Sequence, residues 1–517
     1  MHPSRGRSAW CLAALLLAPA ALPAQQPQPA PQPAAPKRPL VQDVWETAYL
    51  DGFRVGFTHL TVEERATPAG GKVLHAGRDL SLTVRRGPDI ARIQAVTGTD
   101  ETPDGKVVGV FMRQGLAAQV TQEVIGVVKG NQLEVTAQGN QGNFKKLVPW
   151  NPAVIGTLGE LRILKDRKPK PGDKFDYLIY EPIVNALVTI RVKAEAEEAV
   201  PLGPDRPKLL RLTAVPDEIG GVQLPSQILW VDGAFEVRRS ATAMPGLGFL
   251  VVERSTAAEA QRPLNPNQLP DLMQRQSIQL AQRIAWPHAQ NRITYHITMT
   301  NDKEPAKTFA RDTRQEVRNA QGNSFDLVVT AVRQPPTVTT TAAADPGKEF
   351  TENNYFLTSA DRLVKQHAAA AVGGETDPWK KALLVERWVH QNMKVQNFTE
   401  AMAPASEVAR TLTGDCTEYS MLAAAMCKAA GVPARTAIGL VYVDDPRQPL
   451  LGFHMWTEVF VRGAWVGIDA TLGQGSIGPA HLKITDASWH DTRSMTPLLP
   501  LMRVMIGRPT VTVVEVK

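Results

Sequence analysis

The chain has 517 residues, of which 43% are hydrophobic and 21% are charged, and its formal net charge is +6. This composition is typical of globular proteins, excludes a largely disordered chain, and at this length predicts about two to four domains. Because the basic residues are scattered rather than gathered in runs, we expect no nucleic-acid partner; the weak positive charge leaves a cell-envelope association open.

Residues 1–24 have the pattern of a signal peptide. Arg5 and Arg7 precede a short apolar run from Trp10 to Leu17, and small residues up to Ala24 follow. The run is too short and too rich in alanine for a membrane span, so we expect none in the mature chain. We predict an exported protein, periplasmic or secreted. Residues 25–39, rich in proline and glutamine, predict an extended linker.

Residues 40–260 predict an antiparallel β region. Alternating runs at 44–49 and 55–62 flank Asp51-Gly52, and runs at 227–231 and 234–238 flank Asp232-Gly233, which indicates two hairpins with tight turns. Further strand-like runs lie at 80–84, 107–112, 132–137, 186–192 and 209–214. The region therefore predicts one large antiparallel β domain or two small ones.

Residues 261–350 predict a mixed segment. The prolines from Pro263 to Pro270 interrupt the strands, and we expect a helix from there to Ile284. A small β unit at 293–299 and 325–332 and a linker at 337–347 should follow.

Residues 351–517 change to helices followed by strands, which makes the predicted fold class α+β. Polar residues that precede stretches with apolar residues at helical spacing predict the helix starts, and Gly414 and Gly431 predict two helix ends. The predicted N-caps are Ser359, Asp377, Ser406 and Asp415.

Three reactive side chains stand in this region. Cys416 lies at a predicted helix start, His454 in the strand-like run 453–460, and Asp469 near the end of the run 465–471. Amide chemistry at neutral pH needs a thiolate, a proton shuttle and a group that fixes the imidazole tautomer. A helix N-terminus favours a thiolate, and the Cys416 N–H can face a developing oxyanion.

The charge of Asp415 opposes a thiolate at Cys416. We therefore expect its carboxylate to accept the N–H groups of Thr417 or Glu418.

The second cysteine of this helix, Cys427, is eleven residues from Cys416. That separation is about 16 Å along a helix, whereas a disulfide needs Cα atoms within roughly 7 Å. We interpret Cys427 as a core residue. The sequence holds no phosphate-binding glycine motif and no zinc-binding spacing, so we expect no cofactor and no metal.

Four blocks of this region resemble the transglutaminase-like superfamily, over roughly residues 352–480. They read Gly-Asp-Cys-Thr-Glu-Tyr-Ser-Met-Leu at 414–422, Ala-Ala-Gly-Val-Pro-Ala-Arg at 429–435, His-Met-Trp-Thr-Glu-Val at 454–459, and Trp-Val-Gly-Ile-Asp-Ala-Thr at 465–471. The resemblance implies a papain-like core, in which the cysteine helix packs on an antiparallel sheet. It also implies that Cys416 is the nucleophile, His454 the base and Asp469 the orienting acid.

The second oxyanion donor departs from the family pattern. The family often has an aromatic residue between the preceding helix and the cysteine block, where this chain reads Lys-Val-Gln-Asn-Phe at 394–398. Gln396 and Asn397 are therefore the candidates. The calcium sites of animal transglutaminases are not implied, because no matching acidic loop is present.

The functional prediction is an exported cysteine enzyme that acts on peptide or glutamine amides through a Cys416 thioester. Whether water or an amine resolves the thioester is open, with hydrolysis favoured. Trp456 and Trp465 either line the substrate groove or pack in the core. The alternative is a non-catalytic envelope scaffold with a relic domain, in which Cys416 reacts no faster than free cysteine.

Overall fold

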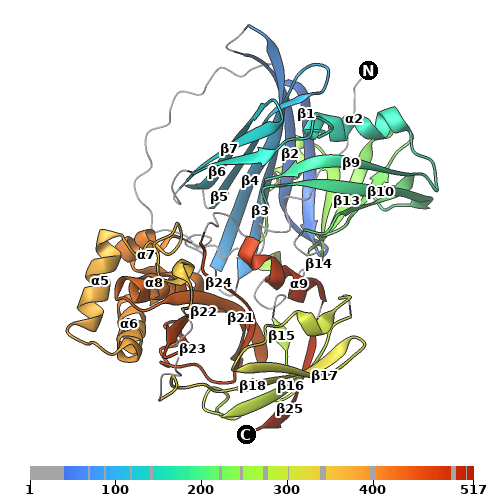
Figure 1. Cartoon of the computed structure of the whole chain (residues 1–517). Helices are drawn as coiled ribbons and strands as arrows, with labels where there is room; N and C mark the ends of the chain where they lie inside the picture. Colours follow the sequence, from blue (N-terminus) through green and yellow to red (C-terminus); the bar gives the residue numbers. More distant parts are fainter. Residues whose placement is uncertain are drawn as a thin grey trace. The chain divides into compact units, whose positions relative to one another are not determined.

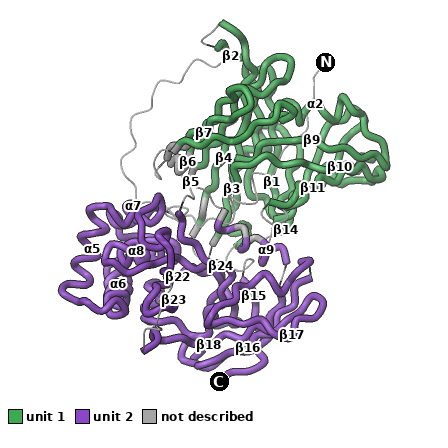
Figure 2. The backbone as a smooth tube through the Cα atoms, viewed as in Figure 1, with its two compact units in different colours: residues 1–273 green, residues 274–517 purple. Residues whose placement is uncertain are grey.

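The computed structural model describes residues 40–517 apart from 68–69, 87–88, 117–118, 140–143, 183, 220–223, 245–247, 272–276, 301, 338–344, 396–402, 491–495 and 508. The predicted signal peptide and proline-rich linker lie outside the described residues. The chain forms two compact units, residues 1–273 and 274–517 (Figure 2). The segment predicted at 351–517 lies in the second unit, whereas the segment predicted at 261–350 is divided, with residues 261–273 in the first unit and 274–350 in the second. In the part that the structure describes, no helix has the length and apolarity that a membrane crossing requires.

Unit 1 is built on one fourteen-stranded sheet (Figure 1), which confirms the prediction of a large antiparallel sheet. Strands β1 to β8 form one meander and β9 to β14 another, and the pairing of β1 with β14 joins them. The strands are β1 (Leu40–Leu50), β2 (Phe53–Ala66), β3 (Lys72–Arg86), β4 (Asp89–Glu101), β5 (Val107–Leu116), β6 (Gln119–Lys129), β7 (Gln132–Gly139), β8 (Phe144–Pro149), β9 (Lys174–Glu181), β10 (Ala186–Ala199), β11 (Lys208–Pro216), β12 (Gln227–Val231), β13 (Val237–Met244) and β14 (Gly248–Ser255).

Both predicted hairpins are present, with one difference in turn length. Asp51 and Gly52 have φ values of 49° and 83°, as a two-residue turn between twisted strands requires. The turn after β12 is longer than predicted, because Phe235 takes a φ of 59° and β13 begins only at Val237. The Asp232 carboxylate holds this turn by accepting the N–H groups of Ala234 and Glu236, each at 3.0 Å.

Helix α2 (Thr157–Arg167) follows the first meander and precedes the second along the chain. Side chains of β4 accept the backbone N–H groups at its N-terminus. Thr99 Oγ1 accepts the Thr157 N–H at 2.9 Å, and Glu101 Oε1 accepts the Leu158 N–H at 2.8 Å. These bonds satisfy helix N–H groups that would otherwise lack acceptors. The first turn of α2 also buries Glu160, whose pKa burial raises to about 8 despite the attraction of Arg78.

The buried Glu160 makes the stability of unit 1 depend on pH. Because its folded pKa lies above the ordinary value of 4.5, the folded state holds a proton that the unfolded chain releases, so stability falls as pH rises from about 4.5 to 8. Glu160→Gln removes this fall, and we expect its stability advantage over the parent to grow by roughly 3.5 kcal/mol between pH 5 and pH 8. The difference in unfolding free energy between this variant and the parent is measured by urea titration at each pH, with hydrogen exchange of residues 157–167 as the probe of unfolding. Glu197→Gln, at an exposed position of β10, is the control, and an equal response of the two variants would contradict the prediction.

Unit 2 contains a five-stranded sheet, a four-stranded sheet and a short parallel pair. The five-stranded sheet has the order β15-β22-β21-β24, with β23 also paired to β22. The four-stranded sheet has the order β17-β18-β16-β25, so the last strand of the chain completes the small β unit predicted at 293–332. The strands are β15 (Ile278–Gln279), β16 (Arg292–Thr298), β17 (Gln315–Gln321), β18 (Ser324–Thr330), β19 (Lys394–Val395), β20 (Thr413–Gly414), β21 (Ala434–Val443), β22 (Leu450–Val461), β23 (Ala464–Ile468), β24 (His481–Ala487) and β25 (Thr510–Val516).

Helix α8 is the centre of the unit 2 core. Every residue from Thr417 to Lys428 is buried, and the small side chains of Ala423 to Ala425 allow close packing on all sides. Thr457 of β22 donates its hydroxyl to the Ser420 carbonyl at 3.1 Å, which ties the helix to the sheet. The helices of unit 2 are α5 (Arg362–Val372), α6 (Pro378–Asn392), α7 (Ala405–Thr411), α8 (Cys416–Ala429) and α9 (Leu499–Gly507).

Three predicted local features are corrected. The helix expected up to Ile284 is absent over the described residues 277–284, where Ile278 instead pairs with Leu451 of β22. Asp361 rather than Ser359 caps α5, accepting the N–H groups of Leu363 and Val364. Ser406 lies inside the first turn of α7. The N-caps predicted at Asp377 and Asp415 are confirmed.

Candidate active site

Cys416 is the first residue of α8 and follows a complete capping box. Asp415 Oδ1 accepts the Thr417 N–H at 3.0 Å and the Thr417 hydroxyl at 2.6 Å, while Glu418 Oε2 accepts the Asp415 N–H at 3.0 Å. The expectation that the Asp415 carboxylate is engaged by the helix is confirmed. These bonds leave the Cys416 N–H out of the cap. From Gly414 to Ser420, Cys416 alone is partly exposed.

Burial also affects the ionisation of Glu418, two residues along α8 from this cysteine. It raises the pKa of Glu418 well above its ordinary value, and the neighbouring Asp415 raises it further. Burial and the neighbouring carboxylate therefore both favour the protonated form of Glu418. Close packing also explains Gly414, because a Cβ there would lie 2.3 Å from Glu418 Cβ.

His454 and Asp469 join Cys416 in one hydrogen-bonded chain. His454 Nε2 lies 2.7 Å from Asp469 Oδ2, and the Cys416 side chain is a further hydrogen-bonding partner of the ring. Burial lowers the pKa of His454, but the charge of Asp469 and the contact with Cys416 outweigh it and raise that pKa to about 10. His454 is therefore an imidazolium at neutral pH, facing the sulfur.

Asp469 is fully buried and accepts four hydrogen bonds. Oδ1 takes the N–H groups of Thr471 and Leu472 at 2.9 and 3.2 Å. Oδ2 takes His454 and, at 2.9 Å, His481 Nε2. Burial alone would raise the pKa of Asp469, yet the charge and hydrogen bond of His454 and the bond from His481 lower it, so the group is anionic.

Helix α6 holds the turn that carries Asp469. Glu386 Oε1 accepts the Gly475 N–H at 2.9 Å, and His390 Nδ1 donates to the Ala470 carbonyl at 2.9 Å. A Cβ at Gly473 would lie 2.5 Å from the His390 ring, so only glycine fits this close contact. Sequence reasoning missed Glu386, His390 and His481, because no local pattern marks them and only the folded chain brings them to Asp469.

The two tryptophans proposed for substrate contact do not fit that role. Trp456 is fully buried with Ala437 and Ile477. Trp465 pairs with Phe460, six residues along β22 from His454, which is about 20 Å at roughly 3.3 Å per residue. Its ring is covered by Arg435, whose guanidinium carbon lies 4.0 Å from the ring centroid. The candidate oxyanion donors Gln396 and Asn397 lie outside the described residues.

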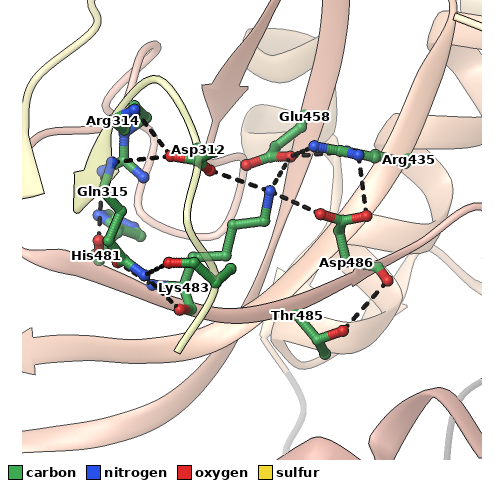
Figure 3. A network of polar contacts seen from close by, with 10 residues as sticks. Asp312, Arg314, Gln315, Arg435, Glu458, His481, Lys483, Thr485 and Asp486 are labelled. Carbon is green, nitrogen blue, oxygen red and sulfur yellow. Dashed lines mark hydrogen bonds and ion pairs between the residues drawn. The ribbon is translucent and has the colours of Figure 1, made fainter. Parts of the chain in front are cut away.

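A buried polar network links β24 to β21 and β22 (Figure 3). Lys483 Nζ lies 2.8 Å from both Glu458 Oε2 and Asp486 Oδ2, and Arg435 bonds the same two carboxylates. Gln315 Oε1 accepts the Lys483 N–H at 2.8 Å, and Arg314 donates to the His481 carbonyl at 3.3 Å. The network thereby sets the position of His481.

Removing the ammonium group from this network should destabilise unit 2. Lys483 is 1% exposed, so Lys483→Met leaves Glu458 buried, with Arg435 in direct contact and the charge of Arg314 acting on it without a direct bond. Breaking a buried pair in this way costs about 3 kcal/mol. Urea unfolding of unit 2 measures the loss, and Lys365→Met at an exposed position of α5 is the control. A loss below about 1 kcal/mol, the size expected for a surface pair, would contradict the prediction.

One group in the described part of the chain offers ligand atoms close enough for a metal ion. The donor atoms of His454, Asp469 and His481 lie within 4.8 Å of one another. However, both imidazole nitrogens that face Asp469 Oδ2 lie within hydrogen-bond distance of it. A ring nitrogen that donates a proton cannot bind a metal ion at the same time. We therefore interpret the group as a hydrogen-bonded cluster.

Comparison with known proteins identifies the domain that holds this site. Residues 365–470 match the family described as the transglutaminase-like superfamily. An uncharacterized protein from Haemophilus influenzae is 34% identical over 85 residues, 16% of this chain and 23% of that protein. The chain thus matches about a quarter of the length of this relative. The resemblance predicted from the sequence is confirmed: the C-terminal part contains a transglutaminase-like domain.

Solved structures with similarity to the chain are distant. A candidate cysteine protease from Cytophaga hutchinsonii is 16% identical, with a TM-score of 0.29, over 44% of this chain and 87% of that one. A β-barrel-like domain of unknown function from Brucella abortus is 11% identical, also with a TM-score of 0.29, over 42% of this chain and 98% of that one.

Proposed function

We propose that the transglutaminase-like domain at residues 365–470 is an exported cysteine enzyme that hydrolyses amide bonds of peptides or glutamine side chains. The observation that carries the proposal is the hydrogen-bonded chain from Cys416 through His454 to Asp469. It combines a nucleophile, an acid–base group and a buried anion, each at the position that the family resemblance implies. The proposed core is papain-like, with α8 packed on β21 and β22.

The reaction begins with attack of the Cys416 thiolate on the amide carbon, which forms a carbon–sulfur bond and moves one electron pair to the carbonyl oxygen. The Cys416 N–H, at the positive end of α8, stabilises that oxyanion. When the carbonyl re-forms, the carbon–nitrogen bond breaks and His454 gives its proton to the leaving amine. The product is a thioester and a neutral imidazole.

The second half of the reaction regenerates the enzyme. His454 takes a proton from water, the resulting hydroxide attacks the thioester, and the carbon–sulfur bond breaks. Cys416 returns as a thiolate beside the imidazolium, and Asp469 stabilises the charged ring throughout. If a primary amine replaces water, the same steps form a new amide, so the balance between hydrolysis and transamidation depends on water access.

Mass spectrometry of a peptide mixture incubated with the full chain, with and without a primary amine, tests the proposal. New peptide ends or a mass gain of about 1 Da at glutamine indicate hydrolysis, whereas incorporation of the amine indicates transamidation. If neither product forms and Cys416 reacts with iodoacetamide at pH 6 no faster than free cysteine, the domain is a non-catalytic scaffold and the proposal fails.

Export is proposed on the pattern of residues 1–24 alone. Expression of the full chain in a Gram-negative host, followed by fractionation and N-terminal sequencing, tests it. The expected result is a periplasmic or secreted protein that begins after one of the small residues up to Ala24. A full-length cytoplasmic product would refute the export step and leave the proposed chemistry standing.

A further inference from the structure

His481 occupies an unusual place beside the proposed catalytic groups. It is the first residue of β24, fully buried, and its Nε2 lies 2.9 Å from Asp469 Oδ2. The same oxygen lies 2.7 Å from His454 Nε2. One carboxylate oxygen of the orienting acid is therefore shared between the acid–base histidine and a second histidine. The Cys416–His454–Asp469 chain does not itself account for the second one.

The contacts of His481 fix its protonation. Its Nδ1 is buried and has no hydrogen-bond partner among the described residues. A proton on Nδ1 would be unsatisfied, and it would turn the lone pair of Nε2 toward an anionic oxygen. The neutral ring with its proton on Nε2 avoids both costs. Burial also lowers the pKa of His481 to about 4, outweighing the attraction of Asp469, so the ring stays neutral at pH 7.

The charged and titratable groups around His481 support a neutral ring. His454 lies 5.8 Å away between ring centroids and is cationic, and His288 lies 5.6 Å away in an edge-on arrangement. Burial lowers the pKa of His288 as well. The Arg314 guanidinium contacts the His481 carbonyl, and Glu386 faces Asp469 from α6. A positive charge on His481 would be repelled by the imidazolium of His454.

We propose that His481 is a positioning residue for the reaction: as a neutral Nε2–H donor it holds Asp469 and takes up part of its negative charge, so that His454 can release its proton. This inference rests on the proposed function of Cys416 and His454. A carboxylate oxygen that served His454 alone would bind the imidazolium more tightly. The proton that must pass to the leaving amine would then transfer less readily.

Two substitutions of similar length separate the donor from the space that it fills. His481→Gln keeps an N–H donor near the position of Nε2, whereas His481→Met fills similar volume without a donor. The measurement is the rate of Cys416 alkylation by iodoacetamide from pH 5 to 11, with brief pH jumps from pH 7 and circular dichroism to confirm folding. The alkaline inflection of this profile reports proton loss from His454.

We expect His481→Met to move the alkaline inflection upward by about one pH unit, a tenfold change in the dissociation constant, and His481→Gln to stay within about 0.3 unit of the parent. A purely structural role would lower the stability of both variants without separating their inflections. Equal inflections in the parent and His481→Met would overturn the inference while leaving the proposed function intact. A parent Cys416 no more reactive than free cysteine at pH 6 would overturn both.

The parent protein provides a second test that needs no substitution. Nitrogen-15 NMR of the histidine rings at pH 7 should show His481 as the neutral Nε2–H tautomer and His454 as an imidazolium. A His481 that carries its proton on Nδ1, or that is cationic at this pH, would overturn the inference even if both variants failed to fold.

Discussion

Cys416→Ala is expected to abolish amide hydrolysis, with a loss of at least about 10⁴-fold in kcat. The Cys416 sulfur forms the covalent intermediate of the proposed reaction, so without it the site keeps binding and oxyanion stabilisation but not the chemical step. The capping box that starts the helix uses Asp415, Thr417 and Glu418 rather than the sulfur, so the fold should remain. Product formation from the peptide mixture, followed by mass spectrometry, measures the loss.

The second cysteine of α8 supplies the matched control. Cys427 is fully buried, and burial raises its pKa to about 12, so it should neither react nor contribute. Cys427→Ala should keep the parent activity per folded molecule and the parent labelling by iodoacetamide, whereas Cys416→Ala should lose both. Labelling that persisted in Cys416→Ala and vanished in Cys427→Ala would reverse the assignment of the nucleophile.

Asp469→Asn should reduce kcat by roughly 10⁴-fold while KM changes little. An asparagine has one acceptor oxygen and one NH₂ group, so it cannot accept the two N–H groups of the backbone turn and those of both His454 and His481. If the NH₂ group faces His454, the ring must turn its bare nitrogen toward it and place its proton toward Cys416. The base is then in the wrong tautomer to accept the thiol proton.

The control for this substitution is Asp361→Asn, at the N-cap of α5. Asparagine caps a helix about as well as aspartate, so this variant should keep full activity and stability. NMR of the His454 ring in Asp469→Asn should show a neutral imidazole at pH 7, because the anion that raises its pKa is gone. Retention of the imidazolium together with full activity would show that Asp469 does not orient the base.

The features that the sequence predicted well are those that neighbouring residues determine. The Asp51-Gly52 turn and the Asp415 cap depend on φ preferences and side-chain acceptors within a few positions, and both are present. Ser359 and Ser406 were wrong as caps because another residue close by occupies the cap position. A single polar residue before a stretch with apolar residues at helical spacing therefore locates a helix start only to within about two or three positions.

Features that depend on distant pairing could not be predicted. Residues 277–284 were expected to be helical, but an edge of β22 was available and Ile278 pairs with it. His481 stands in the sequence without any motif, and only the pairing of β24 with β21 brings it to Asp469. Trp456 and Trp465 were assigned by proximity in sequence. Trp456 does lie near His454, with ring centroids 6.4 Å apart, but it is fully buried, and strand register places Trp465 far along β22 from His454.

The pairing of β1 with β14 has a consequence for how unit 1 matures. Within each meander the strands can add hairpin by hairpin as they leave the ribosome, but one edge of β1 has no partner until Trp45 meets Ser255. Until then a newly made chain exposes an open row of backbone donors and acceptors, the kind of surface that recruits other strands. A translation product truncated just before Gly248 would leave one edge of β1 and one edge of β13 open, and it should self-associate more readily than one extended through Ser255.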